Sequence, residues 1–109
     1  MVKFMILFQR PENLAVFEEN YNRFLALIEH MPFITRRQVI HILGSPRGET
    51  NLFRVLEVYF ESQALLEESL RSPDGQAAGQ TLSNFPANSV EMLFAEVFEE
   101  SGGQTGATF

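Results

Sequence analysis

A histidine, a glutamate and a tyrosine on two neighbouring segments have the side chains that proton-transfer chemistry requires. His41 lies in TRRQVIHIL (35–43), and Glu57 and Tyr59 lie in NLFRVLEVYF (51–60). A carboxylate can orient an imidazole as a general base, and a phenol can hold a substrate oxygen. We therefore predict His41, Glu57 and Tyr59 as catalytic residues, with a structural ion pair at the rim of a barrel as the alternative.

Whether these side chains meet depends on how the two segments pair. Both are rich in β-branched and aromatic residues, and GSPRGET between them carries turn residues throughout, so an antiparallel hairpin is expected. Antiparallel partners keep a constant sum of residue numbers. One register then places six side chains on one face: His41 opposite Val55, Val39 opposite Glu57 and Arg37 opposite Tyr59.

The other face of this hairpin is more apolar, with Ile40, Ile42, Leu56, Val58 and Phe60. We expect helices to cover that face and the polar set to lie between two subunits. Arg37, Val39 and Val55 are accordingly predicted to line a pocket there.

A second stretch with chemically active residue types is Ser72-Pro73-Asp74-Gly75. Serine before proline is the usual start of a helix, because the serine oxygen accepts from a free amide and proline has no N–H to lose. A phosphate-binding loop would end in Gly-Lys-Ser/Thr, and a serine nucleophile would need a strained elbow and a histidine partner. We interpret the stretch as a structural helix cap.

The sequence predicts no cofactor and no metal site. His30 and His41 have neither His-x-His nor His-Glu-x-x-His spacing, and the chain has no cysteine. It also has no Gly-x-Gly-x-x-Gly fingerprint for a dinucleotide. A single histidine can still ligate haem, and haem binding stays as a less favoured alternative.

The elements that must position these residues follow from hydrophobic periodicity. A buried strand over 2–8 offers Phe4, Ile6 and Phe8 to one face of a sheet. An apolar stripe predicts a helix from Glu12 that Pro32 ends, with Leu14, Phe17, Tyr21, Phe24, Ile28 and Met31 on one side. After the hairpin come a helix over 61–71 capped by Ser62, a short helical segment from Ser72, and a strand over 89–98.

This order of strand, helix, two strands, helix and strand predicts one α+β domain, a ferredoxin-like βαββαβ sandwich with a four-stranded antiparallel sheet. The domain is expected over residues 1–98. The Gly/Ser/Thr-rich residues 99–109 are expected to form a tail, with Phe109 able to dock on a partner subunit.

The stretch SPDGQAAGQTLSNF, preceded by YFES and followed by VEMLFAEV, resembles the C-terminal half of the short EthD-like proteins of the dimeric α/β-barrel superfamily. Phe17 and Tyr21 give an F-x-x-x-Y pattern in the first helix. EthD-like proteins commonly carry His-x-Pro late in that helix. The favoured alignment puts Phe24 at the histidine position as a pocket-lining residue, and the other alignment uses His30 before Pro32.

The resemblance implies a homodimer, a dimeric α/β barrel with a partly apolar pocket against each sheet. It implies a small oxidoreductase, a cofactor-free monooxygenase or a proton-transfer enzyme of the isomerase or cyclase type, acting on an apolar or aromatic metabolite. The alternative is a non-catalytic small-molecule binder that serves a degradation or biosynthesis pathway.

The charge of the chain limits its partners. The net charge is −6, from 14 acidic and 8 basic residues, so a nucleic acid backbone would be repelled. The apolar run at the N-terminus is interrupted by QRPEN too early for a signal or a membrane span. We expect a soluble cytoplasmic protein that binds neither nucleic acid nor membrane.

Overall fold

The fold was described from a computed structural model, which places residues 1–101. Most of the predicted tail over 99–109, including Phe109, therefore lies outside the described residues. None of the helices within residues 1–101 is both long and apolar enough to cross a membrane.

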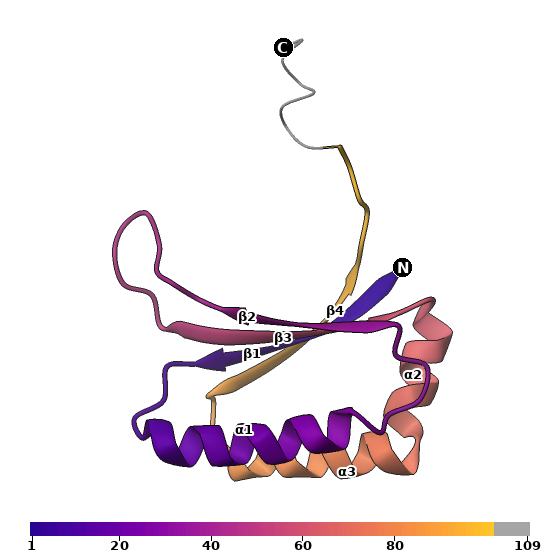
Figure 1. Cartoon of the computed structure of the whole chain (residues 1–109), viewed down its shortest axis with the longest axis horizontal. Helices are drawn as coiled ribbons and strands as arrows, with labels where there is room; N and C mark the ends of the chain where they lie inside the picture. The colour runs from indigo at the N-terminus through magenta and orange to yellow at the C-terminus, as the bar shows by residue number, and fades with distance from the viewer. Residues whose placement is uncertain (102–109) are drawn as a thin grey trace.

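The described chain is a four-stranded antiparallel sheet with its helices on one side (Figure 1). The strand order is β2-β3-β1-β4, which is the split βαβ arrangement and confirms the predicted α+β, ferredoxin-like class. The elements are β1 (Val2–Gln9), α1 (Leu14–Ile28), β2 (Arg36–His41), β3 (Leu52–Phe60), α2 (Gln63–Arg71), α3 (Pro73–Thr81), the 3-10 turn η1 (Leu82–Asn84) and β4 (Val90–Glu96).

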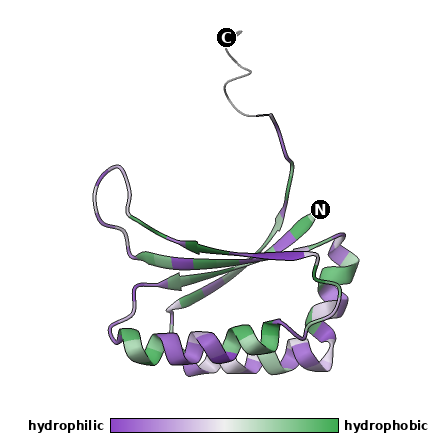
Figure 2. Ribbon diagram, viewed as in Figure 1, coloured by the Kyte–Doolittle hydropathy of each residue, from purple (hydrophilic) through white to green (hydrophobic). Residues whose placement is uncertain are grey.

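Helix α1 follows its apolar stripe but ends earlier than predicted. It begins at an Asn13 cap, whose side chain accepts from the Val16 amide at 3.1 Å, and it ends at Ile28 rather than at Pro32. Figure 2 shows hydrophilic and hydrophobic segments alternating along this helix. The side chain of Met31 is still buried although it lies beyond the helix, because the turn after Ile28 returns it to the core.

The core lies between the helices and one face of the sheet. Phe4, Ile6 and Phe8 of β1 point into it, as the alternation of that strand predicts. The ring of Phe8 contacts four other rings with centroids 5.2–6.3 Å apart, those of Phe17, Tyr21, Phe24 and Phe85. Aromatic packing of this kind fixes α1 and the segment after η1 against the sheet.

The register of the β2–β3 hairpin differs from the prediction by one residue. His41 lies opposite Arg54, Val39 opposite Leu56 and Arg37 opposite Val58. A shift of one residue moves every side chain of a strand to the other face. His41, Arg37 and Val39 therefore lie on the helix-covered face, and the predicted pairs with Val55, Glu57 and Tyr59 are wrong.

The physical reason is that β2 has no decisive alternation. One of its faces would carry Arg36, Gln38 and Ile40, and the other Arg37, Val39 and His41, so each set has two polar residues and one apolar residue. The observed register aligns Val39 with Leu56 and Ile6 in one row across the helix-covered face.

The Ser72 stretch is a helix cap, as predicted. The Ser72 hydroxyl accepts from the Gly75 amide at 3.0 Å and donates to the Ser69 carbonyl at 2.6 Å, so it joins the end of α2 to the start of α3. Ser62 likewise caps α2, accepting from the Leu65 amide at 3.2 Å.

Replacing Ser72 by alanine is expected to lower the free energy of unfolding by about 0.5–2 kcal/mol, because a cap is lost. Urea denaturation monitored by circular dichroism measures this change. Ser83→Ala is the matched control, since Ser83 donates to the Gln80 carbonyl on an exposed surface and caps no helix. Equal stability of the two variants would contradict the assignment of Ser72 as a cap.

Candidate functional site

Two of the predicted catalytic residues, Glu57 and Tyr59, lie together on the face of the sheet that the helices leave uncovered, which we call the open face. The Tyr59 hydroxyl is 3.0 Å from Glu57 Oε1, and Lys3 Nζ donates to Glu57 Oε2 at 3.0 Å. Both side chains are nearly buried, with 5% of Glu57 and 4% of Tyr59 exposed. We call Lys3, Glu57, Tyr59 and their neighbours Arg36 and Gln38 the open-face cluster.

Both carboxylate oxygens of Glu57 are bonded within the open-face cluster. Gln38 Oε1 lies 3.1 Å from the Tyr59 hydroxyl, and the Arg36 guanidinium stacks on the Tyr59 ring at 4.1 Å from its centroid. The cation–π contact with Arg36 and the hydrogen bond to Glu57 hold Tyr59 in one orientation. With each oxygen of Glu57 bonded, the arrangement fits a structural ion pair better than a free general base.

His41 does not belong to this cluster. It lies at the edge of the helix-covered face beside Arg54, whose guanidinium bonds both carboxylate oxygens of Glu18 at 2.5 and 3.1 Å. Arg37 lies on the same face, 3.7 Å from Glu29, and Val39 is exposed there. Val55 is buried on the open face, next to Glu57.

Two titratable groups of α1 near the Arg54–Glu18 pair, Glu18 and Tyr21, have shifted pKa values. The hydrogen bond from Arg54 lowers the pKa of Glu18, and burial of the carboxyl opposes this only in part. Burial raises the pKa of Tyr21, whose ring lies 4.6 Å from the Arg54 guanidinium. These groups pack α1 against β3 on the side of the sheet away from the open-face cluster.

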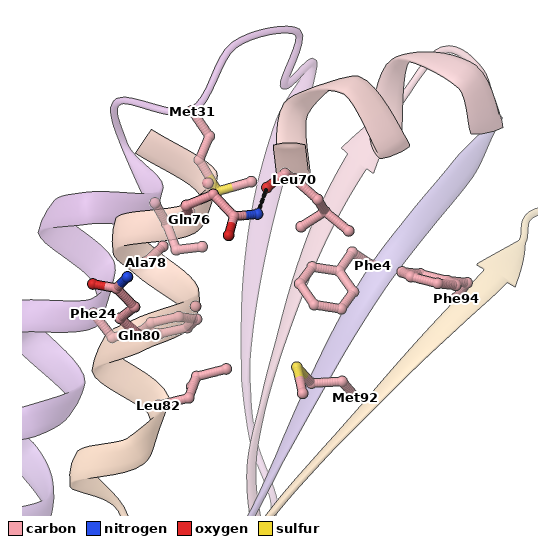
Figure 3. A pocket seen from close by; sticks show the side chains of 13 residues that line it. Phe4, Phe24, Met31, Leu70, Gln76, Ala78, Gln80, Leu82, Met92 and Phe94 are labelled. Atoms are coloured by element: carbon pink, nitrogen blue, oxygen red, sulfur yellow. Dashed lines mark hydrogen bonds between the residues drawn. The ribbon is translucent and has the colours of Figure 1, made fainter. Parts of the chain in front are cut away.

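A pocket of about 410 Å³ opens on the helix-covered side of the sheet (Figure 3). Met92 and Phe94 of β4 and Phe4 of β1 lie on one side of it, and residues of α3 lie on the other. The full lining is Phe4, Phe24, Ile28, Met31, Leu70, Gly75, Gln76, Ala78, Gly79, Gln80, Leu82, Met92 and Phe94. Its volume is in the range of about 300–1,000 Å³ that small-molecule sites occupy.

The chemistry of this lining is apolar and neutral. None of these lining residues has an ionisable side chain, and the polar side chains among them are the two amides Gln76 and Gln80. His30 and His41 are not among them, so the pocket offers no histidine to a haem iron. Within residues 1–101, no group of three or more His, Asp or Glu side chains is placed to hold a metal ion.

Phe24 is the predicted pocket residue that lines this cavity. The pocket predicted from the sequence was on the opposite side, between the sheet and a partner subunit, and Met92, Phe94 and Gln76 were not among its predicted lining residues. The placement of Met92 and Phe94 two residues apart was a usable signal that both share one face of a strand. In the structure their side chains are half exposed, at 53% and 57%. Their exposure marks an edge of the sheet that the helices leave open.

No family model matches the chain. It is similar to the uncharacterized 11.0 kDa protein in the thcB-thcC intergenic region of Rhodococcus erythropolis. The two are 27% identical over 97 residues, which cover 88% of this chain and 94% of the relative. A crystal structure of an EthD family protein from Bacillus halodurans matches with a TM-score of 0.85 and 28% identity, covering 90% of this chain and 99% of that one.

Two more distant structures share the fold. A dimeric ferredoxin-like protein of unknown function from Jannaschia matches with a TM-score of 0.68 and 15% identity, covering 89% of this chain and all of that one. SnoaB, a cofactor-independent oxygenase from Streptomyces nogalater, matches with a TM-score of 0.65 and 15% identity, covering 91% and 94%.

Proposed function

We propose, starting from the resemblance of the chain to an EthD family protein, that it binds a neutral, largely apolar small molecule in the pocket between α3 and the sheet. The observation that carries the proposal is the pocket itself: about 410 Å³, walled by aromatic and aliphatic side chains and free of ionisable groups among its lining residues. The binding free energy of an apolar ligand becomes more favourable in proportion to the apolar surface that it buries against such walls.

Proton abstraction is poorly supported as the activity of this pocket. A general base must lie within hydrogen-bond reach of the proton that it removes, and the lining supplies none. The open-face cluster has a carboxylate, Glu57, but both of its oxygens are bonded and it lies on the other face of the sheet.

A second candidate is an oxygenase that works without a cofactor. It is favoured by the shared fold with SnoaB, a cofactor-independent oxygenase, together with a pocket that excludes charged groups. Incubation of the protein with a bound aromatic ligand, with and without oxygen, followed by mass spectrometry, separates the two candidates. An oxygen-dependent product indicates an enzyme, and an unchanged ligand indicates a binder.

The pocket is tested with the neutral fluorescent probe N-phenyl-1-naphthylamine, which should brighten when it binds. Met92→Glu is expected to weaken probe binding at least about tenfold, because it puts a carboxylate on an apolar wall. Met92 is half exposed on an edge strand, so the fold should tolerate the change. Leu93→Glu, the same change one residue later on the opposite face, is the control and should leave the affinity unchanged.

Equal affinities of the Met92 and Leu93 variants would place the probe elsewhere and count against the pocket. Absence of any probe binding by the wild-type protein would count against the proposal as a whole.

We further propose that the chain is a homodimer that packs open face to open face. The open face carries apolar side chains, among them Met5, Leu7, Ile40 and Leu93, around the open-face cluster, and the similar protein from Jannaschia is described as dimeric. Helices cover only the other face. An obligate interface would bury roughly 2,000 Å² or more.

Light scattering at micromolar concentration should therefore give twice the chain mass of 12.4 kDa. Leu93→Glu should shift this mass toward the monomer, because two carboxylates would be buried in a symmetric interface. Met92→Glu, on the helix-covered face, should remain dimeric. A wild-type monomer would refute the dimer.

A further inference from the structure

One polar contact at the pocket has a fixed direction. Gln76 Nε2 donates a hydrogen bond to the Leu70 carbonyl at 2.9 Å, which joins α3 to the end of α2. Figure 3 shows the Gln76 side chain reaching toward Leu70, with its amide oxygen turned away from that carbonyl toward the middle of the view, where the pocket lies.

This contact determines which end of the amide a ligand meets. An amide flip would set the Gln76 oxygen against the Leu70 carbonyl, and two acceptors cannot share a hydrogen bond. One N–H of Nε2 is therefore committed to Leu70, which fixes the orientation of the amide and turns Oε1, which only accepts, toward a ligand in the pocket.

We infer that the pocket selects neutral ligands that carry a hydrogen-bond donor, such as a phenol, and that Gln76 Oε1 accepts this bond. The inference rests on the proposed function and names its ligand class. A carboxylate or phosphate ligand would find no cationic side chain among the lining residues and would meet Oε1 as a second acceptor. A hydroxyl on an aromatic ring satisfies both the apolar walls and Gln76.

The test compares two ligands that differ in one donor, 1-naphthol and 1-methoxynaphthalene, as competitors of N-phenyl-1-naphthylamine. The ether is the more apolar molecule, so the informative quantity is the ratio of the two dissociation constants in each variant. Gln76→Met keeps the length of the side chain but removes the amide. The preference for naphthol is expected to fall about fivefold, which corresponds to the ~1 kcal/mol of a neutral hydrogen bond.

Gln63→Met, which changes an exposed glutamine at the start of α2 outside the pocket lining, is the matched control and should keep the wild-type ratio. Gln76→Ala is the second variant should Gln76→Met fold poorly, and circular dichroism checks each protein. An unchanged ratio in the folded Gln76 variants would overturn the donor preference while the binding function stands. If neither competitor displaces the probe from the wild-type protein, the proposed function fails together with the inference.

Discussion

The Gly75→Ala variant is expected to lose at least about 1–3 kcal/mol of unfolding free energy, as overpacked interiors do. Gly75 lies where the start of α3 crosses the end of α2, and a Cβ there would overlap the Ser69 carbonyl oxygen and lie 2.7 Å from that of Leu70. Both are backbone atoms of α2, so they cannot move aside as a flexible side chain would. The two helices would have to separate.

Gly79 supplies the internal control for this prediction. It lies four residues later in the same helix, and a Cβ built on it meets no atom within 4 Å. Gly79→Ala should therefore gain up to about 1 kcal/mol from helix propensity. Urea denaturation of both variants measures the contrast, and equal stabilities would mean that the close approach of α2 and α3 is not required.

The Gly75→Ala variant also tests how the fold supports the pocket. Gly75 and Gln76 both line the cavity, and the hydrogen bond from Gln76 to Leu70 crosses the α2–α3 junction. Separation of the helices in Gly75→Ala should also weaken binding of N-phenyl-1-naphthylamine. Gly79→Ala should leave the junction intact.

The second large effect is expected at the Glu18–Arg54 pair. The Arg54 side chain is only 8% exposed, whereas that of Glu18 is 40% exposed. Glu18→Gln would leave a buried guanidinium without its counter-charge, which is strongly destabilising in a fully buried pair. Because water reaches Glu18, we expect a smaller loss of about 1–3 kcal/mol.

The neighbouring ion pair is the control for this change. Glu19 bonds Arg23 at 2.7 Å, with both side chains more than 60% exposed, so Glu19→Gln should cost no more than about 0.5 kcal/mol. The double variant Glu18→Gln/Arg54→Met should recover part of the loss, since it removes the uncompensated charge as well. Equal stability of the Glu18 and Glu19 variants would mean that the burial of Arg54 does not strengthen its ion pair with Glu18.

The pH dependence of stability follows from the lowered pKa of Glu18. A carboxyl whose pKa is lower in the folded state than in the unfolded state stabilises the fold fully above its unfolded value, about 4.3. That contribution is lost as the pH falls through the folded pKa. The wild-type advantage over Glu18→Gln should therefore shrink below about pH 4.3, and denaturation curves from pH 3 to 7 would measure it.

Local features of the structure could be read from the sequence because they depend on a few adjacent residues. Ser62 and Ser72 cap their helices, and Phe17, Tyr21 and Phe24 form the buried stripe of α1. A cap needs only a hydroxyl near a free amide, and a stripe needs only the helical period. The strand and helix order then specified the ferredoxin-like topology.

Features that join distant segments could not be read in this way. The pocket residues Phe4, Leu70 and Met92 lie on three separate elements, and no short-range pattern brings them together. The close approach at Gly75 likewise depends on the angle between α2 and α3. Such contacts are set by the packing of whole elements.

The sequence by itself located the four strands, with ends that differ by a residue or two from the observed ones, and showed that Glu57 and Tyr59 share a face. The tertiary structure alone decided that His41 lies on the other face. Both alternating sets of β2 are equally polar, so the local pattern does not distinguish two registers that differ by one residue. In the observed register the contacts of β2 are with distant residues: Arg37 approaches Glu29, and Val39 aligns with Leu56 and Ile6.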